Sequence, residues 1–114
     1  MDQHLDPHPV AIILTTLGPD ANATAIARTL VSERLAACVN VLPVMTSVFR
    51  WQGNIEQDRE QQLVIKTAAG SIHAIEARLR ELHPYDLPEF LVIPAGGSTA
   101  YLDWVRGSVD GPKR

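Results

Sequence analysis

The stretch Arg34–Gly53, RLAACVNVLPVMTSVFRWQG, decides the fold of this 114-residue chain. Apolar and polar residues alternate in it, as in Val39-Asn40-Val41, and this period of two predicts an extended strand. Pro43 has no backbone N–H to donate, so we expect the strand to bend or bulge there. Trp51-Gln52-Gly53-Asn54 is expected to form a turn in which Gly53 or Asn54 can adopt a positive φ, and a return strand over residues 55–67 then completes a long β-hairpin.

The two halves of this hairpin differ in composition. Residues 56–62 are polar almost throughout, whereas Leu63-Val64-Ile65 is apolar enough to be buried. Only the base of the hairpin therefore belongs to the core. The distal half would leave large apolar side chains in water, and a projecting two-stranded ribbon is marginally stable alone. We therefore expect the ribbon to embrace neighbouring subunits through Val48, Phe49, Trp51 and Ile55.

Before the hairpin, the sequence predicts a strand and a helix. Residues 10–14, VAIIL, form a continuous apolar run that is typical of a central strand. Asp20 or Asn22 can cap a helix that runs to about Ala37, with its apolar residues repeating at a spacing of four.

After the hairpin, Ser71 can cap a second helix, which Pro84 ends. A fourth strand follows over residues 90–93, and Pro94 and Gly96-Gly97 are expected to stop it. A short last helix, capped by Ser98 or Thr99, presents Tyr101, Trp104 and Val105.

The order β-α-β-β-α-β predicts a ferredoxin-like (split βαβ) α+β fold. This fold has a four-stranded antiparallel sheet with helices on one face, here with a long β-hairpin and a short C-terminal helix added. We expect a single domain over residues 10–107, between flexible tails at residues 1–9 and 108–114. The other face of the sheet needs a cover, which association through the sheets would provide.

Composition limits the classes of function. The net charge of −3 and the lack of a Lys/Arg cluster argue against a nucleic-acid partner, and the single Cys38 excludes an intrachain disulfide. The apolar runs are too short to span a bilayer, and the acidic start of the chain does not resemble a signal peptide. We therefore expect a cytoplasmic protein with no membrane partner.

Chemically capable residues concentrate in His83-Pro84-Tyr85-Asp86-Leu87-Pro88-Glu89, where two prolines stiffen a loop that carries an imidazole, a phenol and two carboxylates. Two structural alternatives stay open at this point. His83 can simply hydrogen-bond local carbonyls at the helix end, and Glu89 can pair with an arginine of another chain.

Four segments together resemble the CutA family of divalent-cation tolerance proteins, over Val10 to about Val105. They are RLAACVNVLPVMTSVFRWQGNIEQDRE, LVIKT, LHPYDLPEFLVIP and YLDWV. The resemblance implies a homotrimer linked to tolerance of copper or other divalent metals. It also implies that His83 and Glu89 are metal ligands, although no cofactor is certain.

Two positions bear on that implied metal site. Some CutA proteins carry a cysteine near the end of the first strand, and the matching position here is Thr15, whose hard hydroxyl weakens the case for copper(I). Cys38 matches a family cysteine, but it lies among alanines and valines and is expected to be a small buried residue. His4 and His8, beside Asp2 and Asp6, could bind a metal weakly if the tail became helical, which Pro7 disfavours.

The sequence leaves two functions other than metal binding open. One is a PII-like trimeric regulator that binds a small anionic ligand at the subunit cleft through Arg50, Trp51 and Lys66. The other is an enzyme that uses His83 with Asp86 or Glu89 as an acid/base pair. No nucleophile elbow or HExxH motif supports catalysis, so we expect no enzyme and no catalytic residue.

Overall fold

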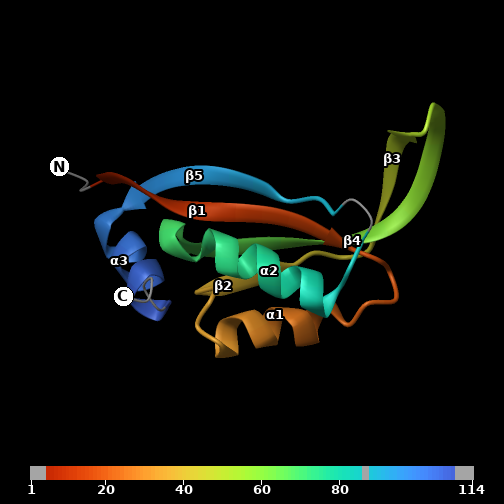
Figure 1. Ribbon diagram of the computed structural model, residues 1–114. Coiled ribbons are helices and arrows are strands. Elements are labelled where there is room, and N and C mark those ends of the chain that lie inside the picture. Colours follow the sequence, from red (N-terminus) through yellow and green to blue (C-terminus); the bar gives the residue numbers. More distant parts are fainter. Residues whose placement is uncertain (1–4, 86–87, 110–114) are drawn as a thin grey trace.

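The computed structural model describes residues 5–85 and 88–109, and a five-stranded antiparallel sheet forms its centre (Figure 1). Four strands lie side by side, in the order β2 (Cys38–Val41), β4 (Asn54–Ala68), β1 (Leu5–Leu17) and β5 (Leu91–Ser98). The fifth strand, β3 (Met45–Trp51), pairs with the distal half of β4. This order confirms the ferredoxin-like prediction with its long β-hairpin, and it divides the predicted second strand into β2 and β3.

Two helices cover one face of the sheet, and a third packs at one end of the opposite face. α1 (Ala23–Ser32) and α2 (Ile72–Leu82) share one core with β1 and β4, in which Ile13 and Ile65 are fully buried and lie in register. α3 (Thr99–Ser108) forms a second, smaller cluster with residues that include Val10. The prediction that the two helices of the split βαβ unit lie on one face is thus confirmed, and the short C-terminal helix, whose side was not predicted, packs on the other face.

Among residues 5–85 and 88–109, nothing covers much of the sheet face opposite α1 and α2. Strand alternation places on it every second residue of β1 and of the proximal half of β4, since residues between them such as Ile13 and Ile65 are buried against the helices, and the register with β1 extends this face onto β5. We call this the open face, and its central residues are Ile12, Leu14, Val64, Lys66, Leu91 and Ile93.

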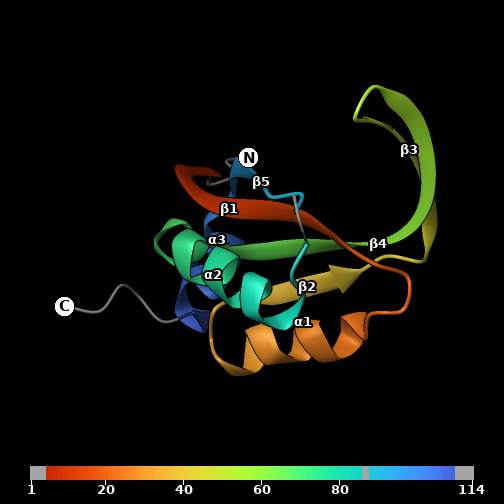
Figure 2. The same cartoon turned by 45° about the vertical axis from the view of Figure 1, so that its right-hand side comes forward.

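The ribbon β3–β4 leaves the sheet at the end remote from α3. Figure 2 shows it rising away from α1 and α2 and curling at its tip. The predicted bend at Pro43 is confirmed, because β2 ends at Val41 and β3 starts at Met45. In the turn, Gln52 and Gly53 have φ of 51° and 84°. Of the two residues that could take a positive φ, Gly53 does so and Asn54 does not. The second positive φ belongs to Gln52, and two consecutive positive φ values are typical of a type I′ turn.

The first helix ends five residues earlier than the predicted Ala37. Glu33 is the C-cap, Arg34 adopts φ of 59°, and the Leu35 N–H bonds the Leu30 carbonyl, which is a Schellman arrangement. The sequence did not predict this helix end, because the left-handed position after the C-cap usually carries glycine and here carries arginine. At the other end of the helix, the Asn22 side chain accepts from the Ala25 N–H and confirms the predicted cap.

The last strand was predicted too short. β5 continues through Pro94 and the glycines to Ser98, because it lies at the sheet edge, where a proline N on the outer side needs no partner. β1 likewise starts at Leu5, five residues before the predicted domain start, and pairs there with Ser98. Ser98 caps α3 as predicted by accepting from the Tyr101 N–H.

Ser71 stands at the N-cap of α2, as predicted, but its side chain makes no capping hydrogen bond there. No helix within residues 5–85 and 88–109 is long and apolar enough to cross a membrane.

Candidate functional site

His83 is the C-cap of α2 and faces the loop that joins β1 to α1. Its Nε2 accepts a hydrogen bond from the Gly18 N–H at 3.2 Å. The neutral imidazole accepts through one nitrogen and donates through the other, so this contact assigns the proton to Nδ1. The unprotonated nitrogen, which is the one able to bind a metal, is therefore occupied by a backbone contact.

Tyr85 packs edge-on against this imidazole, with ring centroids 4.7 Å apart. The loop can come so close because Gly18 has no side chain. A Cβ at that position would lie 3.2 Å from the Tyr85 hydroxyl oxygen and 3.8 Å from His83 Cε1. Burial raises the pKa of the Tyr85 phenol, and the carboxylates of Glu60 and Asp58 raise it further. The phenol thus stays neutral and lies near the acidic base of the ribbon.

Glu89 is held at both its backbone and its side chain. Its carbonyl oxygen accepts from the buried Thr15 hydroxyl at 2.8 Å, and its Oε2 accepts from the Gln62 side-chain amide at 3.2 Å. Gln62 lies in register with Thr16, on the side of the sheet opposite α1 and α2. The carboxylate is therefore directed to that side, whereas His83 faces the β1–α1 loop.

The three positions that the family resemblance singled out, Thr15, His83 and Glu89, line one small pocket between the end of β1 and the C-terminal half of α2. Its cavity volume of about 20 Å³ suits roughly one water molecule. The other lining residues are Thr16, Leu17, Glu76, Leu79, Arg80, Tyr85, Pro88 and Phe90. A metabolite does not fit in this space, so an anionic ligand of the PII-like kind would have to bind between copies.

A metal ion fits this pocket only in part. Among the described residues, no group of three or more His, Cys, Asp or Glu side chains could hold one ion. A closed tetrahedral site needs four ligands, and here Thr15 and His83 already make hydrogen bonds to the backbone. The described part of one chain therefore supplies at most two ligands, and the assignment of His83 and Glu89 as ligands stays a prediction.

The other candidates lie outside this pocket or beyond the described residues. Cys38 is half-buried at the start of β2, and Phe49, Arg50 and Trp51 are exposed on the ribbon. Asp86 lies outside the described residues, so the acid/base pair that includes it was not observed. The expectation that this chain is no enzyme stays a prediction.

Sequence reasoning missed the residues that hold the pocket together. Gln62 fixes the Glu89 carboxylate, and the neighbouring Gln61 donates to the carbonyls of Gly18 and Ala21. The only available signal was that Gln61 and Gln62 begin the buried half of the return strand, where a polar side chain requires a partner.

Comparison with known proteins decides the family. The CutA1 divalent ion tolerance protein family matches residues 11–108. The chain belongs to this family. A divalent-cation tolerance protein CutA from Thermus thermophilus is 44% identical over 96 residues, which are 83% of this chain and 93% of that protein.

Solved CutA structures agree with the fold. The crystal structure of CutA from Xylella fastidiosa is 46% identical, with a TM-score of 0.82 over 90% of this chain and 99% of that one. A protein described as PII-like CutA from Nostoc, in its apo form, is 36% identical, with a TM-score of 0.79 over 88% of this chain and 97% of that one. The CutA resemblance predicted from the sequence is confirmed.

Proposed function

We propose that this chain acts in divalent-cation tolerance as a homotrimer whose copies cover one another's ribbons. The single observation that supports this is the exposure of large apolar side chains on the ribbon: Val48 is 66% and Ile55 71% exposed in the single chain. Apolar surface of this kind on a thin two-stranded projection indicates an interaction site.

Sedimentation of ribbon variants tests the assembly. Val48→Asp with Ile55→Asp places charges where the proposal has apolar contacts, and it should shift the protein from trimer to monomer. A matched control, Val31→Asp on α1, introduces a charge at another exposed valine and should leave the trimer intact. An intact trimer in the ribbon variant would contradict the proposal.

We further propose that His83 and Glu89 contribute the metal contacts of each copy, with water or a neighbouring copy completing the coordination. The support is that both residues line one pocket and that imidazole and carboxylate both suit divalent metals. The two side chains are directed apart in the single chain, so they would have to turn towards one another or bind through water. Binding through His83 Nε2 would break the Gly18 hydrogen bond, so we expect modest affinity. Leaving a buried N–H unsatisfied costs about 1–3 kcal/mol.

Calorimetry with copper(II) and zinc(II) tests this assignment on protein without residues 1–8, which removes His4 and His8. His83→Gln keeps an acceptor for the Gly18 N–H but removes the imidazole, and Glu89→Gln removes the charge while keeping an amide near Gln62. Both variants should bind metal at least about tenfold more weakly. Unchanged binding in folded variants would exclude these residues as ligands.

A cytoplasmic location and the absence of nucleic-acid and membrane partners belong to the same proposal. They rest on the composition of the chain, in which acidic side chains outnumber Lys and Arg by 13 to 10. Fractionation of the source cells tests the location, with a fluorescent tag used to measure how much of the protein is in each fraction.

A further inference from the structure

The β1–α1 loop, residues 18–22, lies at the end of the sheet from which the ribbon leaves, and side chains of two other elements hold it (Figure 2). Gln61 of β4 donates from its side-chain amide to the carbonyl oxygens of Gly18 and Ala21, each at 3.0 Å. His83, at the C-cap of α2, accepts from the Gly18 N–H. Gly18 is therefore held through its carbonyl group by one element and through its N–H by another.

The middle of this loop is open to solvent, whereas its flanks are anchored. Pro19 and Asp20 are exposed, while Leu17 before the loop and Ala23 after it are only 2% and 3% exposed. Segments with few buried contacts open locally at a small cost in free energy. The loop can therefore change its conformation while both flanks stay folded, and the hydrogen bonds from β4 and α2 decide its position.

The neutral imidazole of His83 has only one nitrogen lone pair to offer, because its other nitrogen carries the proton. In this structure the Gly18 N–H uses that lone pair, and a metal ion would need the same one. The other tautomer does not remove the conflict, because its proton sits on Nε2 and faces the Gly18 N–H. His83 can therefore hold the loop or a metal ion, but not both.

The space beside the imidazole is also too small for both partners. The Gly18 nitrogen lies 3.2 Å from Nε2, whereas a bond from imidazole to zinc is itself about 2.0 Å long. Either the loop moves away from His83 or the imidazole turns away from the loop. In both cases the Gly18 N–H loses its acceptor.

We propose that metal binding by His83 and closure of the β1–α1 loop exclude each other, so that the position of the loop depends on whether the site is occupied. In the metal-free chain, His83 and Gln61 hold the loop together. Once His83 binds a metal, Gln61 alone restrains the loop, which then opens more often. This inference rests on the proposed role of His83 as a metal contact, and it adds the response of the chain to that binding.

The coupling acts in both directions, because linkage between two binding equilibria is reciprocal. If metal binding loosens the loop, then loosening the loop strengthens metal binding. Gln61 allows this to be tested, since it restrains the loop from outside the pocket, whose described lining residues do not include it. Gln61→Ala should therefore bind zinc(II) about fivefold more tightly or better, although Gln61 is not a ligand.

Calorimetry with zinc(II) measures this effect on the full chain carrying His4→Gln and His8→Gln. Thr67→Val is the matched control, because the Thr67 hydroxyl also joins β4 to a loop, through the Leu35 carbonyl at 2.6 Å, but not to the β1–α1 loop. Its zinc affinity should equal that of the parent protein. An unchanged affinity in Gln61→Ala, or an equal gain in both variants, would overturn the proposal.

Hydrogen exchange followed by NMR observes the loop directly and needs no Gln61 variant. Saturating zinc(II) should speed exchange of the Gly18 and Ala21 amides at least about tenfold, because the bond that closes the loop is lost. The Ala37 N–H, which donates to the Lys66 carbonyl at 2.9 Å, is the internal reference and should exchange at an unchanged rate. Unchanged exchange at Gly18 and Ala21 in the zinc-saturated protein would overturn the proposal.

His83→Gln in the same experiments separates the two levels of inference. Absence of zinc binding, or binding that His83→Gln leaves unchanged, would remove the proposed metal contact and this coupling together. Binding that depends on His83 but changes neither the exchange of Gly18 nor the affinity of Gln61→Ala would remove only the coupling.

Discussion

The Thr15 hydroxyl donates a hydrogen bond of 2.8 Å to the carbonyl oxygen of Glu89, which lies 74 residues farther along the chain. The contact ties the end of β1 to the segment that enters β5. It also gives a structural use to the position at which some family members carry a cysteine. In this chain that position joins two segments of backbone through a hydroxyl group.

Thr15→Val should destabilise the fold by about 1–3 kcal/mol, because valine keeps the volume but leaves the Glu89 carbonyl without its donor. Thr15→Ser should cost less, since the hydroxyl remains. Urea unfolding of the three proteins at one fixed concentration gives the comparison, because association makes apparent stability depend on concentration. Equal losses in the two variants would show that the hydrogen bond does not matter.

His83→Ala and His83→Gln separate the structural role of this residue from a role in metal binding. Alanine removes the acceptor for the Gly18 N–H and should cost about 1–3 kcal/mol, whereas glutamine can retain an acceptor and should cost less. The measurement is urea unfolding without metal. A glutamine variant as unstable as the alanine variant would mean that the ring contact with Tyr85 matters more than the hydrogen bond.

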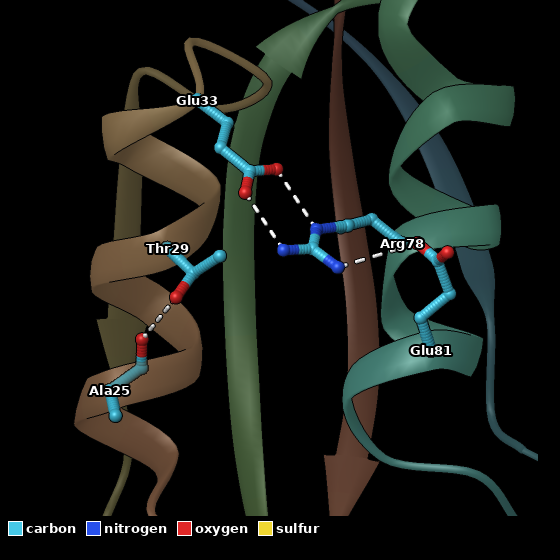
Figure 3. Close-up of polar contacts among 5 residues, drawn as sticks. All are labelled: Ala25, Thr29, Glu33, Arg78 and Glu81. Carbon is cyan, nitrogen blue, oxygen red and sulfur yellow. Dashed lines mark hydrogen bonds and ion pairs between the residues drawn. The ribbon is translucent and has the colours of Figure 1, made fainter.

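Figure 3 shows the ion pair that joins α1 to α2. The Arg78 guanidinium donates two hydrogen bonds, at 2.9 and 2.8 Å, to the Glu33 carboxylate, and a longer one to Glu81. The hydrogen bonds from Arg78 hold the pKa of Glu33 below its ordinary value of 4.5. The contribution to stability is therefore fully present above about pH 4.5 and is lost as the pH falls through the lowered pKa of the folded state.

Arg78→Met should therefore lower the thermal midpoint slightly at pH 7, and the difference from wild type should shrink as the pH falls below 4.5. The effect is small because the pair is exposed to solvent. Arg80→Met is a suitable control, since its partner Glu76 lies within α2 and joins no second element. A wild-type advantage that persists at pH 2 would contradict this explanation.

Arg34 makes a favourable side-chain contact, but its own backbone is strained. Its φ of 59° disfavours any residue with a Cβ, while its guanidinium donates to the Gly107 carbonyl at 3.1 Å. Both Arg34→Gly and Arg34→Ala lose the side-chain contact, but only glycine relieves the backbone. The glycine variant should be about 1 kcal/mol more stable than the alanine variant in thermal unfolding. The reverse order would mean that the backbone at this helix end relaxes on substitution.

The order of strands and helices followed from the sequence because period-two and period-four patterns survive in Val39-Asn40-Val41 and in the apolar stripes of α1 and α2. Boundaries set by tertiary context did not follow. Arg34 ends a helix where glycine is usual, and Pro94 continues a strand because that strand is an edge. A single sequence contains neither fact.

The candidate site was predictable in its members but not in its contacts. The family resemblance brought Thr15, His83 and Glu89 together, and the structure places all three in one pocket. That His83 accepts from Gly18 and that Gln62 binds Glu89 depends on how the end of β1 and the loop after α2 pack. Contacts of this kind depend on packing and leave no local pattern in the chain.

The most direct test of the central claim is the mass of the full-length protein by light scattering over a dilution series from 100 to about 1 μM, a range in which specific trimers persist. We predict one species at three times the chain mass of 12.5 kDa throughout the series. A species at the mass of a single chain across the whole range would contradict the account, because the ribbon and the open face would then remain uncovered in solution.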